Sequence, residues 1–194
     1  WISGQPWGFE VKLPTDFEYR TAGRIRKQSV SYWMNKGVLK INGDALNSPI
    51  QIKDIDWAQA ANDYSALHLK ADDKVAILVP SGSDGPAFLV GRNFDAIYAY
   101  NASESYALAI ALLSDQLAGR PALKTPWPTD DPGLSRAQRR ELQSLLLLKG
   151  YEIGKADGMI GLKTRAAIID FQKQVGMKPD GRPGLKTLEA LKTP

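Results

Sequence analysis

Residues 157–164 read DGMIGLKT, and residues 180–187 read DGRPGLKT, 23 positions further along the chain. Six of the eight positions are identical, and we call these segments the first block and the second block. A block that recurs at a fixed spacing indicates two copies of one small structural unit. The two blocks therefore decide how the last third of the chain folds.

Each block begins with an Asp-Gly pair, which favours a tight turn because glycine adopts positive φ without a steric cost. The second glycine of each block leads into a helix whose first turn contains Thr164 or Thr187. We interpret Asp157 and Asp180 as turn-forming residues rather than as catalytic acids. The blocks predict a turn followed by a helix, used twice.

A further helix is predicted before the first block. Ser135 is a good N-cap, and Gln138 three residues later completes a capping box. The helix should cover residues 136–149 and end at Gly150.

The two block helices begin near residues 162 and 185. Their apolar positions fall on one helix face each and should form one shared core: Ala167, Ile168, Phe171, Val175, Leu188 and Leu191.

The segment at residues 125–133 reads TPWPTDDPG and contains three prolines, which disfavour helix and stiffen the backbone. We therefore predict a first domain at 1–124, a linker at 125–133 and a second domain at 134–194.

The two parts of the chain differ in charge. Residues 1–131 carry 13 Lys/Arg and 15 Asp/Glu, whereas residues 132–194 carry 12 Lys/Arg and 6 Asp/Glu. A basic second domain suits an acidic polymer such as nucleic acid or anionic cell wall, although a solvated basic face is the alternative.

Composition excludes several classes of active site. The chain has no cysteine and one histidine, His68, so disulfides, Ser-His-Asp sites and multi-histidine zinc sites are excluded within it. We interpret His68 as a structural residue of a strand. No stretch approaches the roughly 20 apolar residues of a membrane helix, so no membrane span is expected in this chain. No export signal is visible in the sequence, which starts at Trp1 without a methionine.

The front part has short β-prone runs at residues 38–42, 66–69, 75–79 and 87–90. The second and third runs flank residues 70–74, which suit a hairpin loop. A helix is predicted from Ser103 to Leu117. The front part is thus predicted to be an α+β unit with a small β segment between helices.

A mixture of phenols, an amide and a hydroxyl surrounds the start of that helix: Tyr100, Asn101, Ser103 and Tyr106. Ser103 is also explained as an N-cap. Tyr100 and Asn101 are expected to precede the helix, where their side chains can face a groove. Sugar recognition uses this mixture, because aromatic faces cover pyranose rings and amides bind ring substituents.

The last 60 residues resemble the three-helix peptidoglycan-binding module that is attached to many wall-active enzymes. The residues that carry the resemblance are Leu142, Gln143, Gly150, Tyr151, Asp157, Gly158, Gly161, Thr164, Ala167, Ile168, Phe171, Gln172, Gly176, Asp180, Gly181, Thr187, Leu188 and Leu191.

Residues 1 to about 120 resemble the C-terminal half of the B-type lytic murein transglycosylases. The run GPAFLVGRNF at residues 85–94 and the run YNASESYA at residues 100–107 carry this resemblance, together with WGFEVKLP at residues 7–14. It implies part of a lysozyme-like lobe that cleaves peptidoglycan glycan strands and leaves a 1,6-anhydro end. It also implies that Tyr100, Asn101, Ser103 and Tyr106 line the glycan groove, with no cofactor. Some relatives carry a calcium loop, but no D-x-[DN]-x-[DN]-G pattern occurs here, so no metal is predicted.

The resemblance places the glutamate that acts as general acid and base upstream of residues 7–10, so no catalytic residue is predicted in this chain. Glu10, Glu104 and Asp95 are poor replacements, because Glu10 lies in an extended run, Glu104 in a variable position and Asp95 beside a turn. We expect the chain to be one piece of a larger periplasmic or cell-envelope enzyme, inactive alone and completed by an upstream lobe.

One alternative remains. The chain could be a non-catalytic peptidoglycan-binding or scaffold protein. Nucleic-acid binding is not expected, because Tyr151 and Phe171 fit the apolar core pattern rather than a surface for stacking on bases.

Overall fold

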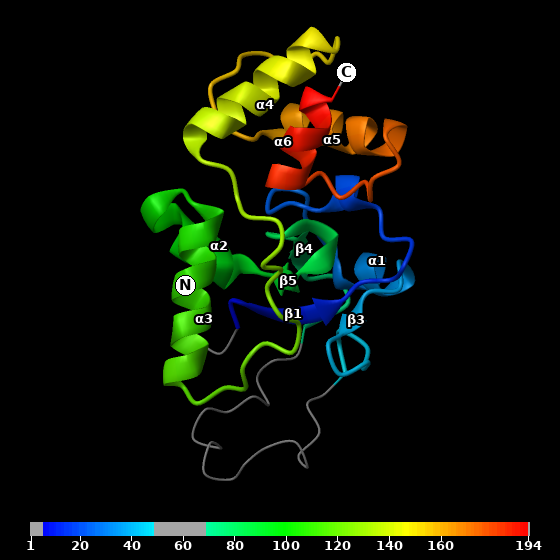
Figure 1. The fold of residues 1–194 in the computed structure, drawn as a ribbon. Helices are drawn as coiled ribbons and strands as arrows, with labels where there is room; N and C mark the ends of the chain where they lie inside the picture. Colours follow the sequence, from blue (N-terminus) through cyan, green and yellow to red (C-terminus); the bar gives the residue numbers. More distant parts are fainter. Residues whose placement is uncertain (1–5, 49–68, 194) are drawn as a thin grey trace. The chain divides into compact units, whose positions relative to one another are not determined.

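The computed structural model describes residues 6–48 and 69–193 (Figure 1). The chain divides into two compact units. Unit 1 holds residues 1–17, 21–79 and 86–126, and unit 2 holds residues 18–20, 80–85 and 127–194. The domain limits 1–124, 125–133 and 134–194 stay predictions.

Unit 1 is built on an antiparallel sheet with the strand order β2-β4-β5-β1-β3. The strands are β1 (Gly8–Lys12), β2 (Gln28–Ser29), β3 (Leu39–Lys40), β4 (Lys74–Leu78) and β5 (Ala87–Val90). The central strand β5 is buried along its whole length, which matches its uninterrupted apolar sequence.

Three of the predicted strand runs are confirmed as β3, β4 and β5. The predicted hairpin between residues 66–69 and 75–79 is not tested, although β4 is seen to pair with β2 and β5. Residues 66–68, including His68, lie outside the described residues.

Two helices pack on one face of this sheet. They are α2 (Arg92–Asn101) and α3 (Glu104–Leu117), which lie side by side (Figure 1). Helix α3 confirms the predicted helix, whereas α2 was not predicted, and the first element among the described residues is the strand β1. The shared core consists of Trp7, Ala76, Leu78, Phe88, Val90, Phe94, Ala107, Leu108 and Ala111.

The short helix α1 (Val30–Asn35) begins at Ser29, whose side chain accepts a hydrogen bond from the Tyr32 N–H. It contributes Trp33, which is fully buried and donates its indole N–H to the Val75 carbonyl at 3.1 Å. This bond fastens α1 to β4.

Unit 2 contains the three predicted helices, α4 (Arg136–Leu148), α5 (Leu162–Gln174) and α6 (Leu185–Lys192) (Figure 1). The capping box of Ser135 and Gln138 is confirmed. The helices enclose one core of Leu134, Leu142, Leu146, Ile153, Ala167, Ile168, Phe171, Leu188 and Leu191. The prediction for Val175 was wrong: it lies beyond the end of α5 as its C-cap and is exposed. Two short 3-10 turns, η1 (Tyr19–Thr21) and η5 (Gly82–Asp84), complete the described elements.

The first block forms a turn that a glutamine of α4 holds in place. Gly158 has φ +81°, and its N–H donates to the Gln143 side-chain oxygen at 2.6 Å. The Gln143 amide in turn donates to the Met159 carbonyl at 3.0 Å and to the Asp157 carboxylate at 3.3 Å. The pKa of Asp157 is lowered, first by the hydrogen bond from the Met159 N–H and then by Gln143. Asp157 is therefore a turn-forming residue, as predicted.

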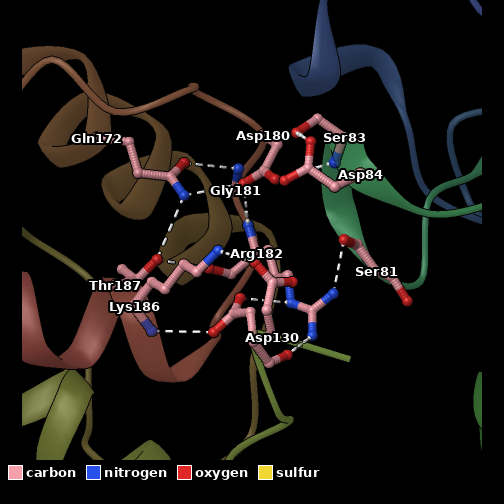
Figure 2. A network of polar contacts seen from close by, with 11 residues as sticks. Ser81, Ser83, Asp84, Asp130, Gln172, Asp180, Gly181, Arg182, Lys186 and Thr187 are labelled. Carbon is pink, nitrogen blue, oxygen red and sulfur yellow. Dashed lines mark hydrogen bonds and ion pairs between the residues drawn. The ribbon is translucent and has the colours of Figure 1, made fainter. Parts of the chain in front are cut away.

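The second block repeats this arrangement with a glutamine of α5 (Figure 2). Gly181 has φ +72°, and its N–H donates to the Gln172 side-chain oxygen at 2.8 Å. The Gln172 amide donates to Asp180 at 2.9 Å and to the Thr187 hydroxyl at 3.3 Å. Asp180 also accepts from the Arg182 N–H, which confirms it as a turn-forming residue.

The second block makes further contacts within unit 2. Arg182 pairs with the Asp131 carboxylate at 2.9 Å and donates to the Ser81 carbonyl at 2.7 Å (Figure 2). The Ser83 N–H donates to Asp180 at 3.0 Å. Asp131 also accepts the Lys186 N–H at 2.9 Å, in the first turn of α6. Residues 80–85 and the predicted linker thus share one polar network with the second block.

Candidate functional site

The four predicted site residues lie at the corner between α2 and α3. Gly91 follows β5 directly and is the N-cap of α2, which ends at Asn101. Ala102 is the C-cap of α2, and Ser103 is the N-cap of α3. Only two residues therefore separate the helices.

Tyr100 and Tyr106 face each other across this corner. Their ring centroids are 6.2 Å apart and their planes are inclined by 21°, which is a stacked arrangement. Tyr100 is 84% exposed, and Tyr106 is half-buried. An exposed aromatic pair presents flat apolar surface together with two hydroxyl groups, which suits an amphipathic ring such as a sugar.

Asn101 and Ser103 lie between the two rings in the sequence. Tyr100 and Asn101 precede α3, as predicted, but they do so as the exposed last residues of α2, a helix that was not predicted. The Ser103 hydroxyl accepts the Tyr106 N–H at 3.3 Å, which confirms its N-cap role. Asn101 is thus the amide of this group that is open to solvent.

Helix α3 carries apolar residues on two opposite faces. Ala107, Leu108 and Ala111 are buried against the sheet. Ile110, Leu113 and Leu117 are exposed and, with Tyr106, follow a spacing of four, three and four residues. At 3.6 residues per turn these four lie within roughly 60° of arc, opposite the buried face. We call Tyr106, Ile110, Leu113 and Leu117 the apolar stripe.

The three carboxylates considered as replacement acids are engaged elsewhere or lie open to solvent. Glu10 is buried in β1, and its two oxygens accept the N–H groups of Lys124 and Thr125, each at 2.8 Å. Asp95 lies in the first turn of α2 and pairs with Arg24 at 3.2 Å and with Lys27. Glu104 is exposed in the first turn of α3. Within the described residues, no hydrogen bond or ion pair holds any of these three carboxylates next to Tyr100 or Tyr106.

Sequence reasoning missed Asp115, whose pKa is raised by burial although Arg120 and Trp7 act in the opposite direction. A raised pKa is the property of a general acid. Asp115, however, accepts the Trp7 indole N–H at 3.0 Å and pairs with Arg120. It also lies on the buried side of α3, away from the apolar stripe. Asp115 therefore fastens α3 to the residues before β1.

Two hollows occur away from the tyrosine pair. One of about 290 Å³ lies in unit 1 beside Phe9, Lys74 and Arg92, and one of about 190 Å³ lies in unit 2 beside Asp180 and Arg182. Among residues 6–48 and 69–193, no group of three or more His, Cys, Asp or Glu side chains could hold a metal ion. Within the same residues, no helix combines the length and apolar character needed to cross a membrane.

Known proteins match both parts of the chain. Residues 1–115 match the family described as Transglycosylase SLT domain, and residues 135–191 match the family of the peptidoglycan binding domain. A spore cortex-lytic enzyme of Bacillus cereus is 43% identical over 51 residues, which are 26% of this chain and 20% of that enzyme.

Two crystal structures of SltB3 from Pseudomonas aeruginosa resemble the fold. The complex with NAG-anhNAM-pentapeptide matches 100% of this chain and 46% of SltB3, with a TM-score of 0.83 and 39% identity. The complex with NAG-NAM-pentapeptide matches 99% of this chain and 46% of SltB3, with a TM-score of 0.82 and 39% identity. This chain thus spans less than half of SltB3 and about a fifth of the cortex-lytic enzyme.

These matches confirm the α+β lysozyme-like fold and the peptidoglycan-binding module, and they connect the chain with proteins of the bacterial cell wall or envelope. The family match covers more than half of the chain and includes the α2–α3 corner. The chain belongs to the transglycosylase SLT domain family and carries a peptidoglycan-binding domain behind that domain.

Proposed function

We propose that this chain supplies one wall of the glycan groove and the wall-binding module of a lytic transglycosylase. The observation that carries the proposal is the exposed stack of Tyr100 and Tyr106 with Asn101 beside it. The SltB3 complexes support it, since that similar protein binds a disaccharide peptide of the NAG-NAM type. Peptidoglycan strands are the proposed substrate, and the periplasm is the proposed compartment.

The proposed reaction breaks the glycosidic bond between a muramic acid C1 and the leaving oxygen of the next sugar. A carboxylic acid gives its proton to that oxygen, and the muramic 6-hydroxyl oxygen then bonds to C1. The resulting carboxylate accepts the 6-hydroxyl proton, so that no water enters the product. Tyr100 and Tyr106 would hold the ring, and Asn101 would hydrogen-bond its N-acetyl group or orient the acid.

We propose that the acid comes from a lobe outside this sequence. Glu10 and Asp95 are committed to structural contacts, and Asp115 lies on the buried side of α3. The apolar stripe supports this proposal, because Ile110, Leu113 and Leu117 leave a continuous apolar face that begins at Tyr106. A lobe that covers this face would bring its carboxyl group close to the stacked rings.

The second candidate function is a non-catalytic peptidoglycan-binding protein. The engagement of Glu10 and Asp95 favours it, because a chain without an available acid can bind glycan but cannot protonate the leaving oxygen. Both candidates share the domain limits proposed above, 1–124 and 134–194.

One experiment separates the two candidates. The 194-residue chain is incubated with purified sacculi, and both sedimentation with the sacculi and release of anhydromuropeptides are measured. We expect binding without release from this chain, and release from the full-length gene product that contains it. A full-length product that binds sacculi and releases nothing would establish the non-catalytic candidate.

The role of Asn101 is tested in the full-length product. Asn101→Ala should lower turnover about 100-fold, the size typical of one lost positioning or electrostatic contact, while sacculus binding stays unchanged. Ser114→Ala, an exposed change in the third turn of α3, is the control and should leave turnover unaltered. Unchanged turnover in Asn101→Ala would remove this residue from the site.

A further inference from the structure

The link between α2 and α3 depends on one residue with an unusual backbone conformation. Ala102 has φ +46° and ψ +32°, in the left-handed region, and its N–H donates to the Tyr98 carbonyl at 2.7 Å. It is the one non-glycine residue with positive φ among those the structure describes. Ser103 then has extended geometry, and α3 begins at Glu104.

Packing does not account for an alanine at this position. The left-handed conformation brings Cβ close to the following carbonyl, so glycine or asparagine is the usual choice at such a helix end. Ala102 is exposed, so its methyl group has no core to fill. A residue held in a sparsely populated region points to a geometric requirement of the surrounding structure.

The requirement is visible in the two rings that flank the corner. In one continuous helix, residues six positions apart lie about 120° apart around the axis, so their side chains diverge. The observed corner departs from one continuous helix at two residues, because Ala102 is left-handed and Ser103 is extended. An ordinary helical φ at residue 102, about 110° away from the observed value, would redirect α3 relative to α2 and move Tyr106 away from Tyr100. The observed Tyr100–Tyr106 stack therefore depends on the left-handed residue together with the extended one.

We infer that Ala102 is a positioning residue, whose left-handed conformation sets the Tyr100–Tyr106 pair as a glycan-stacking surface. This inference rests on the proposed function, in which the two rings form one wall of the groove. Ala102 itself makes no contact with substrate in this view. It acts through the direction in which α3 leaves the end of α2.

Three variants of the full 194-residue chain test the inference. Ala102→Val disfavours the left-handed region, because a β-branched side chain is hindered there, whereas Ala102→Gly and Ala102→Asn accept it. Ala109→Val is the matched control, since it adds the same branched side chain at an exposed position of α3 outside the corner. NMR cross-peaks between the two tyrosine rings report the stack. Saturation transfer to the tetrasaccharide of N-acetylglucosamine reports binding, with Tyr100→Ala/Tyr106→Ala as its baseline.

Ala102→Val should lower the population of stacked rings about tenfold, in line with the penalty of the left-handed region, and reduce the saturation transfer toward the baseline. The glycine, asparagine and Ala109→Val variants should retain both signals. Ring cross-peaks that persist at full strength in Ala102→Val would overturn the inference. Loss of the cross-peaks in both Ala102→Gly and Ala102→Asn would also overturn it. These two variants decide the question if the valine variant does not fold. A wild-type chain without transfer above the baseline contradicts the proposed glycan wall instead, and the ring cross-peaks still decide the role of Ala102.

Discussion

The first and second blocks share six of eight residues, yet they have different polar neighbours. Arg139 and Arg140 of α4 donate to carbonyls of the first block, whereas the second block contacts Ser81, Ser83 and Asp131. Both turns use a glycine with positive φ and a buried glutamine that binds the turn. Position three of the block differs: Met159 is exposed in the first, whereas Arg182 in the second binds Asp131 and Ser81. Identical residues therefore fix the local turn, and the differing Arg182 adds contacts outside it to the one that Asp180 makes with the Ser83 N–H.

The largest expected effect comes from replacing Arg182, the residue that gives the second block its contacts with Asp131 and Ser81. Arg182→Met leaves the Asp131 carboxylate, itself 12% exposed, without its ionic partner. We expect the free energy of unfolding of unit 2 to fall by about 3 kcal/mol. Native-state hydrogen exchange of the α5 and α6 amides measures this change. Met159→Ala, at the same position of the first block, should cost under about 0.5 kcal/mol, and equal losses in both variants would contradict the comparison.

The shared glutamines should give two similar effects. Gln143→Ala and Gln172→Ala each leave the buried N–H of a turn glycine without its acceptor. Each should lower the free energy of unfolding by about 2 kcal/mol, measured by the same exchange experiment. Gln174→Ala is the control, because this exposed residue accepts one bond from the Tyr151 hydroxyl and should cost little. A large loss in only one of the two variants would show that the turns are held differently.

The second glycine of each block, Gly161 or Gly184, shows whether glycine is needed there for lack of space or for its backbone freedom. Gly161 and Gly184 are both N-caps with negative φ, so positive φ is not what requires glycine at these positions. A Cβ at Gly184 would lie 2.0 Å from an Asp131 oxygen, whereas a Cβ at Gly161 would meet nothing within 4 Å. Both lose the same N-cap preference for glycine over alanine. Gly184→Ala should therefore be less stable than Gly161→Ala by about 1 to 2 kcal/mol in urea unfolding, and equal stabilities would sink the explanation.

The smallest expected effect is a shift in the pKa of Tyr19, which, of the two blocks, only the second influences. Burial, followed by the charges of Asp180 and Asp84, raises the pKa of Tyr19 from its ordinary value of 10.0 to about 12. The folded protein keeps this proton while the unfolded chain loses it, so the contribution to stability is present below pH 10.0 and disappears as the pH rises to about 12. The tyrosinate absorbance band follows the titration. Asp180→Asn, in the second block, should lower the Tyr19 pKa, and Asp157→Asn, at the same position of the first block, should leave it unchanged.

Much of unit 2 could be predicted from the sequence, because its signals are local. The capping box at Ser135, the Asp-Gly turns and the apolar spacing of α5 each act over a few residues. Val175 was misplaced because the spacing continued past the point where α5 ends. The clamping glutamines carry no local signal, since Gln143 and Gln172 act on turns 15 and 9 residues away.

The residues of the candidate site were predicted, but the backbone that positions them was not. Tyr100, Asn101, Ser103 and Tyr106 were identified from their residue types, but α2 was not, so the corner that brings the two rings together was missed. A left-handed alanine has no sequence signature, because alanine favours helix continuation. The engagement of Glu10 by residues 124 and 125 could not be predicted either, because it joins segments more than 100 positions apart.

The sequence by itself determined the doubled turn-plus-helix unit, the polymer-binding character of the module and the residue types of the site. Short-range capping, turn and periodicity rules are sufficient for the turn-plus-helix unit, whereas the polymer-binding character rests on the family resemblance and the site on residue types. Only the tertiary structure decided that Arg182 joins the second block to Asp131 and Ser81, and that Tyr100 stacks on Tyr106. These contacts depend on where distant segments or successive helices meet, and that is set by packing rather than by neighbouring residues.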